Sequence, residues 1–142
     1  MIRNGRQKKN HDEVVNITVT ELSGKVIKSA GDGSLCVFDG PVRATRCAMA
    51  LRARLKELDS RTRCGLNFGQ VDGVANDVVG KTVNISSCVM DLAEADQIFL
   101  TKDTADVLTG ADLSKSFVGK YQLKGFEVEW DVYQICWEIS VF

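Results

Sequence analysis

One carboxylate in a glycine-rich turn is the first group in this sequence that could do chemistry. Asp32 stands between Gly31 and Gly33, and glycines let a phosphate or a metal ion come close to the backbone. Lys28 lies four residues earlier, on the segment that leads into the turn. An Asp-Gly pair in an arbitrary sequence is most often only a turn former, so this motif needs company before it indicates a function.

Two later segments add polar residues to this motif. Asp77 begins the stretch DVVGKTVN, which ends in Asn84 near the expected start of a helix, and Lys124 stands in a Leu-Lys-Gly turn. Each residue also has a purely structural explanation: a solvent-facing strand position for Lys28, a turn former for Asp77, a helix start for Asn84 and a hairpin charge for Lys124. Residue types alone favour these structural explanations.

The elements that must position these residues follow from turn signals and periodicity. Pro41 fits the first turn of a helix, and the apolar stripe that follows it predicts a helix to about Leu58. The full set of expected elements is a helix over 11–22, strands over 25–30 and 35–39, the helix over 41–58, a strand within 61–71, a hairpin connection over 72–81, a helix over 82–93, a strand over 97–101, a short helix over 102–108, and strands over 117–123 and 129–137. This order predicts one α+β domain over residues 1–142, a mixed sheet with helices packed on one face.

Composition narrows the class of protein. The chain has 142 residues with 44% hydrophobic and 26% charged residues, as in an ordinary globular domain. With 18 basic and 19 acidic residues there is no basic excess, so we expect no nucleic-acid partner. No apolar run approaches the roughly 18 to 20 residues of a membrane-spanning helix, and no secretory signal is evident, so we expect a cytoplasmic location. Five cysteines without a CxxC pair predict reduced thiols.

Five stretches occur in the order and spacing of a known family. They are HDEVV, GKVIKSAGDGSLCVFDGPVRATRCAMAL, RCGLNFGQV, DVVGKTVNISS and LKG. Through them the sequence resembles the class III adenylate and guanylate cyclase catalytic domain over about residues 11–135. The resemblance implies a ferredoxin-like α+β sheet. It also implies active sites between two antiparallel subunits, and therefore a homodimer or a heterodimer with another cyclase chain.

The resemblance also implies a role for each candidate residue. Asp32 matches one of two aspartates that hold a pair of Mg²⁺ or Mn²⁺ ions at the phosphates of ATP. Lys28 and Asp77 match the pair that reads the base, and a lysine with an acceptor carboxylate suits adenine. Asn84 matches the residue that orients the ribose, and Lys124 resembles a lysine near the triphosphate. The implied reaction forms cyclic AMP and pyrophosphate from ATP.

Two departures from the family pattern argue against full activity. The family's first strand, with its second metal aspartate, should lie some thirty residues before His11. Only ten residues precede His11, and none of them is acidic. We therefore expect residues 1–10 to form a flexible arm that supplies neither strand nor carboxylate, so that the domain lacks the family's first strand. Alternatively, Met1 is not the natural start or the gene is a fragment. The second departure is Cys88, four residues after Asn84, where the family has a transition-state arginine; a thiol is only a weak neutral donor.

Three functions stay open on these grounds. The first is an adenylate cyclase, impaired when this chain acts alone. The second is a degenerate cyclase domain that binds nucleotide or acts as a regulatory dimer partner. The third is an interaction module of the same fold without nucleotide chemistry, because a fold does not fix a function. The joint presence of Lys28, Asp32, Asp77 and Asn84 counts against the third.

Overall fold

The computed structural model describes residues 2–4, 8–30, 33–69, 72–74 and 77–136. Its elements, in chain order, are β1 (Ile2–Asn4), α1 (Lys8–Glu21), β2 (Lys25–Ala30), β3 (Gly33–Val37), α2 (Pro41–Glu57), β4 (Thr62–Leu66), β5 (Asp72–Val74), β6 (Asp77–Val79), α3 (Lys81–Leu92), β7 (Ile98–Thr101), α4 (Lys102–Val107), β8 (Lys115–Gln122) and β9 (Glu129–Ile135).

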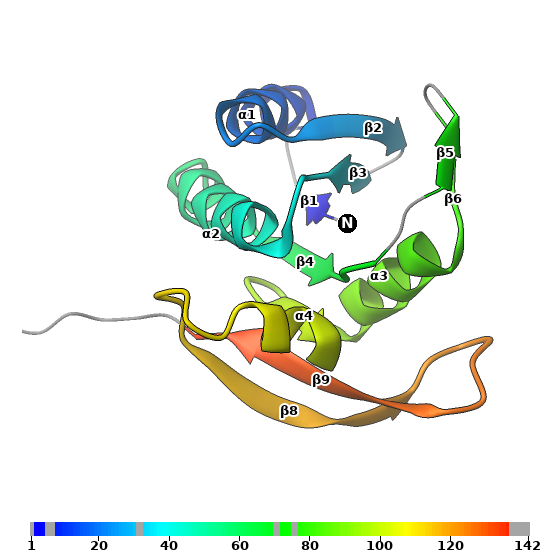
Figure 1. Cartoon of the computed structure of the whole chain (residues 1–142). Coiled ribbons are helices and arrows are strands. Elements are labelled where there is room, and N and C mark those ends of the chain that lie inside the picture. The colour runs from blue at the N-terminus through cyan, green and yellow to red at the C-terminus, as the bar shows by residue number, and fades with distance from the viewer. Residues whose placement is uncertain (1, 5–7, 31–32, 70–71, 75–76, 137–142) are drawn as a thin grey trace, which may run out of the picture.

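A mixed seven-stranded sheet forms the frame of the described structure (Figure 1). Its strand order is β2-β3-β1-β4-β7-β9-β8. The β4–β7 pair is parallel and the other pairs are antiparallel. Two local hairpins, β2–β3 and β8–β9, therefore occupy the two edges, and strands distant in the sequence meet in the centre. The α+β class with a mixed sheet is confirmed.

The helices are divided between the two faces of this sheet. On β7, Ile98 and Leu100 join the core formed with α1, α2 and α4, whereas Phe99 joins the smaller core under α3. Successive strand residues point to opposite faces, so α3 covers the face opposite the other three helices. The expectation that the helices pack on one face is therefore wrong for α3. Every residue of β7 is buried, as is typical of a strand that is covered on both faces.

The short strand β1 lies in the centre of the sheet. It pairs with both β3 and β4, and Ile2 stands opposite Ser34 on one side and Cys64 on the other. The prediction that residues 1–10 supply no strand is wrong, and α1 already begins at Lys8. Strand pairing uses backbone donors and acceptors, so a polar segment without an apolar pattern can meet this need of the neighbouring strands.

The local predictions around the first hairpin and α2 are confirmed. β2 and β3 pair as an antiparallel hairpin, with Ala30 opposite Gly33. Pro41 is the first residue of α2, whose buried residues include Cys47, Leu51 and Leu55. The expected hairpin connection contains the small β5–β6 ladder. None of the described helices combines the length and the apolar character that a bilayer crossing requires.

The cysteines behave as small apolar residues. All five are free thiols. Burial raises the pKa of Cys36 to about 11, of Cys47 to about 12 and of Cys64 to about 11. These three groups are therefore protonated at neutral pH, which fits the prediction of reduced thiols used for packing.

Candidate functional site

Lys28 and Asp77 lie on two strands that contact each other. Lys28 is exposed on β2, and Asp77 is the first residue of β6. β2 and β6 belong to different sheets, yet their backbones come together. The fold thus brings together the segments of the two residues that were predicted to read the base. Asp32 lies outside the described residues.

Asn84 and Cys88 lie one turn apart on α3, on the side of the β8–β9 turn. Asn84 is exposed and Cys88 is half-buried. The thiol of Cys88 donates a weak hydrogen bond to the main-chain oxygen of Lys124, with 3.9 Å between Sγ and oxygen. The structure therefore places Cys88 beside the main chain of Lys124. Lys124 itself is exposed.

A second contact fastens the β8–β9 turn to the start of α3. The ammonium group of Lys81 lies 5.8 Å from the centre of the Phe126 ring, within the range of a cation–π interaction. Phe126 in turn meets Trp130 edge to face, with 6.0 Å between the ring centres. The turn that holds Lys124 is thus held against the first turns of α3.

Close packing on β4 fixes the position of α3. Gly65 has no side chain, and a Cβ there would lie 2.3 Å from the main-chain oxygen of Ser86 and 2.4 Å from the nitrogen of Met90. The Ser86 hydroxyl donates to the main-chain oxygen of Gly65 at 2.6 Å. The glycine of the RCGLNFG stretch is therefore a packing requirement for the helix that carries Asn84.

Sequence reasoning missed a polar connection at the end of β4. The Asn67 amide nitrogen donates to the main-chain oxygen of Thr82, at 3.1 Å, in the first turn of α3. Its amide oxygen accepts from the Thr101 hydroxyl at 2.9 Å. Thr101 also lies 2.9 Å from the hydroxyl of Thr104. The NFG sequence looks like an ordinary turn, and the partners lie 15 and 34 residues away, so no local signal could have found this connection.

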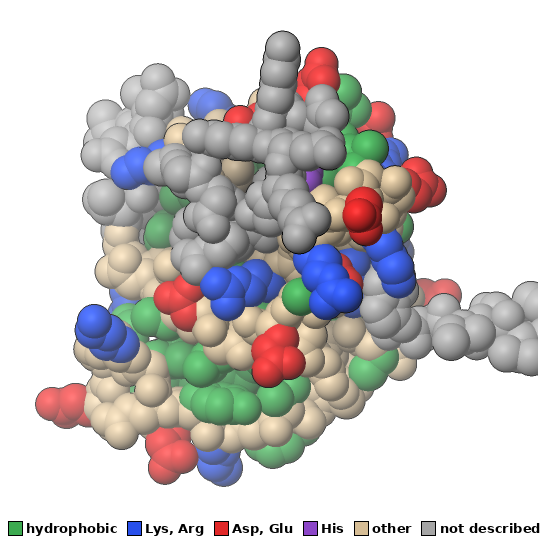
Figure 2. All heavy atoms as spheres, turned by 180° about the vertical axis from the view of Figure 1, so that it is seen from behind, with side chains coloured by type: hydrophobic (Ala, Val, Ile, Leu, Met, Phe, Trp, Pro, Cys, Tyr) green, Lys and Arg blue, Asp and Glu red, His purple; other side chains and the backbone are tan. Residues whose placement is uncertain are grey.

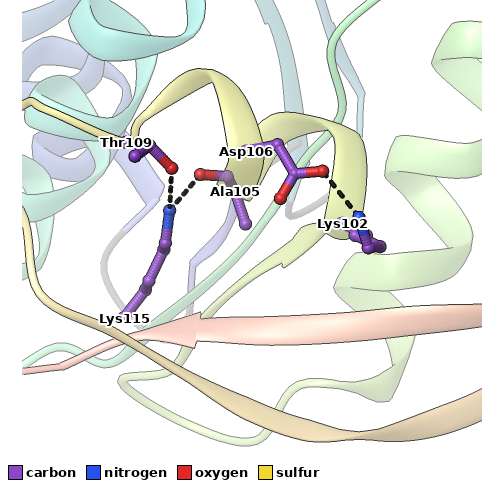
Figure 3. Close-up of polar contacts among 5 residues, drawn as sticks. All are labelled: Lys102, Ala105, Asp106, Thr109 and Lys115. Atoms are coloured by element: carbon purple, nitrogen blue, oxygen red, sulfur yellow. Dashed lines mark hydrogen bonds and ion pairs between the residues drawn. The ribbon is translucent and has the colours of Figure 1, made fainter.

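The helix that begins after Thr101 is anchored at its other end (Figure 3). The Lys115 ammonium group donates to the main-chain oxygen of Ala105 and, at 3.2 Å, to the Thr109 hydroxyl. On the exposed side of α4, Lys102 pairs with Asp106 at 2.7 Å. Among these five labelled residues, only Lys115 comes from β8, so it ties the edge hairpin to α4.

A cavity of about 280 Å³ lies beside the start of α3. Its walls come from β3, the first turns of α2, the end of β4 and the first turns of α3. The lining is largely apolar, with Asp39, Asn67, Thr82 and Ser86 as polar members. Of the predicted site residues with described side chains, none lines this cavity.

The described carboxylates do not gather into a metal site. In the described part of the chain, no group of three or more His, Cys, Asp or Glu residues could hold a metal ion. The predicted metal ligand, Asp32, lies outside that part. The described residues therefore do not by themselves form a metal site.

The comparisons with known proteins agree with the fold. The family model of the adenylate and guanylate cyclase catalytic domain matches residues 18–136. An uncharacterised protein of Mycobacterium tuberculosis strain H37Rv is 32% identical over 131 residues, covering 88% of this chain and 45% of that protein. The chain thus spans less than half the length of this relative.

Solved structures give the same result. A crystal structure of an adenylate/guanylate cyclase/hydrolase from Silicibacter pomeroyi superposes with a TM-score of 0.82 at 18% identity, covering 96% of this chain and 95% of that one. The adenylyl cyclase CyaB from P. aeruginosa gives 0.77 at 19% identity, covering 92% and 81%. The guanylate cyclase domain from Catenaria anguillulae, solved with GTP, gives 0.75 at 18% identity, covering 90% and 80%. The structural neighbours thus include both adenylyl and guanylyl cyclases. The cyclase family uses a divalent metal ion. The chain belongs to the adenylate and guanylate cyclase catalytic domain family.

Proposed function

We propose that this domain binds ATP and that its reaction, weak in this chain alone, is the formation of cyclic AMP and pyrophosphate. The contact between β2 and β6 is the observation that carries the proposal, because it joins the segments of Lys28 and Asp77. These two residues lie 49 positions apart, and only the fold brings their strands together. If Lys28 were only a solvent-facing strand residue, its position would not require the segment of Asp77 nearby.

The choice of adenine follows from the hydrogen-bonding capacity of this pair. A lysine ammonium group only donates, and an ionised aspartate only accepts. Adenine offers a ring acceptor and an exocyclic amino donor, which this pair can satisfy together. Guanine presents a carbonyl acceptor where adenine has the amine, so an aspartate at that place would repel it.

The remaining residues would meet the sugar and the phosphates. Asn84 would orient the ribose, and Lys124 would lie near the triphosphate. In the reaction, the ribose 3′-oxygen forms a bond to the α-phosphorus, the bond from that phosphorus to the bridging oxygen breaks, and pyrophosphate leaves. The hydroxyl proton is released to solvent. Charge on the α-phosphate rises during this step, and one preorganised donor there typically accounts for a factor of about 10² to 10³ in rate.

Cys88 favours a second candidate function, a regulatory subunit that retains nucleotide binding without turnover. Its thiol is half-buried and directed at the main-chain oxygen of Lys124, so it supplies no cationic donor for the phosphate. Binding of ATP does not need that donor as strongly as turnover does. Such a subunit would pair with another cyclase chain.

Both functions involve a dimer, which we propose as the working form. Exposed apolar side chains support an interface on this domain. Figure 2 shows apolar side chains gathered low on the rear face, at the end of the molecule where Figure 1 places β8 and β9. Phe117, which is 53% exposed, and Val128, which is 64% exposed, belong to that hairpin. Large apolar side chains in water favour association.

One experiment separates these functions. Cyclic AMP formation from ATP with Mn²⁺ is measured for the purified chain and for Asp32→Ala, together with the oligomeric state and the ATP dissociation constant. Activity that vanishes in Asp32→Ala supports the cyclase. ATP binding by a folded dimer without activity supports the regulatory subunit. A folded protein that binds no ATP contradicts both.

A further inference from the structure

The start of α3 is the element on which the proposed nucleotide site depends most. This helix begins shortly after β6, the strand that carries Asp77, and its first turn contains Asn84. The N-cap residue Gly80 provides no side-chain cap hydrogen bond. A helix start without such a cap needs another constraint to hold its position.

We infer that Asn67 is a positioning residue, which holds the first turn of α3, and with it Asn84, in the geometry for nucleotide binding. This inference rests on the proposed function for its link to ATP. Its structural part rests on three hydrogen bonds, through which the Asn67 amide joins the first turn of α3 to the buried hydroxyls of Thr101 and Thr104.

The direction of each hydrogen bond in this chain of contacts is fixed. A main-chain oxygen only accepts, so the Asn67 group that faces Thr82 must be the amide nitrogen. The amide oxygen then faces Thr101, whose single hydroxyl hydrogen is used to donate to it. Thr104 must therefore donate to Thr101 at their 2.9 Å contact. Donors and acceptors match at each step only in this arrangement.

The far end of the connection is buried, and the near end lies at the surface. Thr101 and Thr104 are 0% and 1% exposed, at the junction of β7 and α4. Thr82 is half-buried, and Asn84 and Lys81 are exposed. Asn67 therefore ties the start of α3, which lies at the surface, to the buried junction of β7 and α4. Gly69 adds to the fit, because a Cβ there would lie 2.8 Å from the Thr82 hydroxyl.

Asn67→Asp is the sharpest test, because it changes one NH₂ group into an oxygen at constant shape. An aspartate can still accept from Thr101 but faces the main-chain oxygen of Thr82 with an acceptor and a charge. Asn16→Asp makes the same chemical change on the exposed side of α1 and serves as the matched control. Two readouts are taken on protein shown to be folded: amide hydrogen exchange along the chain and the dissociation constant of ATP with Mn²⁺.

We expect Asn67→Asp to speed exchange at the amides of the first turns of α3 by about tenfold and to weaken ATP binding by a similar factor. Exchange in β8 and β9 should stay within twofold of the original protein. Asn16→Asp should change neither readout by more than twofold. A merely structural role would lower protection throughout the sheet without a local maximum in α3.

The inference is overturned if exchange at the start of α3 in Asn67→Asp stays within twofold of the original protein. If Asn67→Asp does not fold, Thr101→Val takes its place, since it removes the donor to Asn67 with little change in shape. If the original protein binds no ATP, the proposed function fails, while exchange still decides whether Asn67 holds the helix start. Faster local exchange with unchanged ATP affinity would refute the link to binding.

Discussion

The main-chain oxygen of Gly65 accepts a 2.6 Å hydrogen bond from the Ser86 hydroxyl at a place where no Cβ separates strand from helix. α3 therefore lies directly on β4, and this contact is two residues after Asn84, the residue proposed to orient the ribose. Packing this close leaves no room for adjustment, because protein interiors are as dense as organic crystals.

Gly65→Ala should consequently destabilise the fold strongly. The added Cβ would meet main-chain atoms of Ser86 and Met90 at 2.3 and 2.4 Å, and only a shift of the whole helix would relieve the overlap. We expect a loss of about 3 kcal/mol in the free energy of unfolding, measured by urea denaturation. Gly119→Ala is the control, since the nearest atoms to its Cβ belong to the movable ring of Tyr121, at 3.3 Å, and it should change stability little. Equal stability of both variants would contradict the packing argument.

Lys28→Ala should weaken ATP binding by about tenfold, the effect of losing one charge-assisted hydrogen bond. Lys25→Ala, which removes an exposed lysine from the same strand β2, should leave the affinity within twofold. Calorimetry with ATP and GTP measures both. If the original protein binds GTP as tightly as ATP, the proposed choice of adenine is refuted. An equal loss of ATP affinity in the two variants would show that Lys28 contributes only general positive charge.

Lys115→Met should destabilise the domain more than Lys102→Met. Lys115 is half-buried and donates to the Ala105 oxygen and to the Thr109 hydroxyl, so its replacement removes two hydrogen bonds at the end of α4, and the Ala105 oxygen keeps only the Leu108 amide as a donor (Figure 3). We expect about 1–2 kcal/mol from thermal or urea unfolding. Lys102 forms an exposed pair with Asp106, and water and salt screen such pairs, so its replacement should have little effect. The reverse order of stability would exclude Lys115 as an anchor.

Stability should fall below neutral pH because of His11. Burial lowers the pKa of this imidazole below its usual 6.5, although nearby Asp12 partly opposes the shift. The unfolded chain therefore takes up a proton at a higher pH than the folded chain does, and protonation favours unfolding. The free energy of unfolding should decrease as the pH falls below about 6.5 and level off once it passes the pKa of the folded state. His11→Phe should remove this part of the pH dependence. An unchanged profile between pH 5 and 7 would show that His11 is not its source.

The parts of the fold with local signals were predictable. The Asp-Gly turn predicted β2–β3, and Pro41 with its apolar stripe predicted α2. Side-chain patterns failed where the backbone decided the outcome: β1 forms because β3 and β4 need a pairing partner, and nothing in the side chains of residues 2–4 indicates it. The family pattern predicted Lys28 and Asp77 as a base-reading pair, and the fold brings their two strands into contact. Asn67 was missed because its partners are distant in the sequence.

The strand order also governs how the chain reaches this structure. β2–β3 and β8–β9 close over short turns, so these two hairpins can form early and independently. The centre requires Ile2 to meet Cys64 and Cys64 to meet Ile98, which closes long loops at a high cost in chain entropy. We therefore expect the two edge hairpins to form first. The slow step of folding would then be the assembly of the sheet, in which both hairpins are joined through the central strand β4. Slow refolding would leave the edges of β4 open to pairing between chains, so yield should fall as the protein concentration during refolding rises.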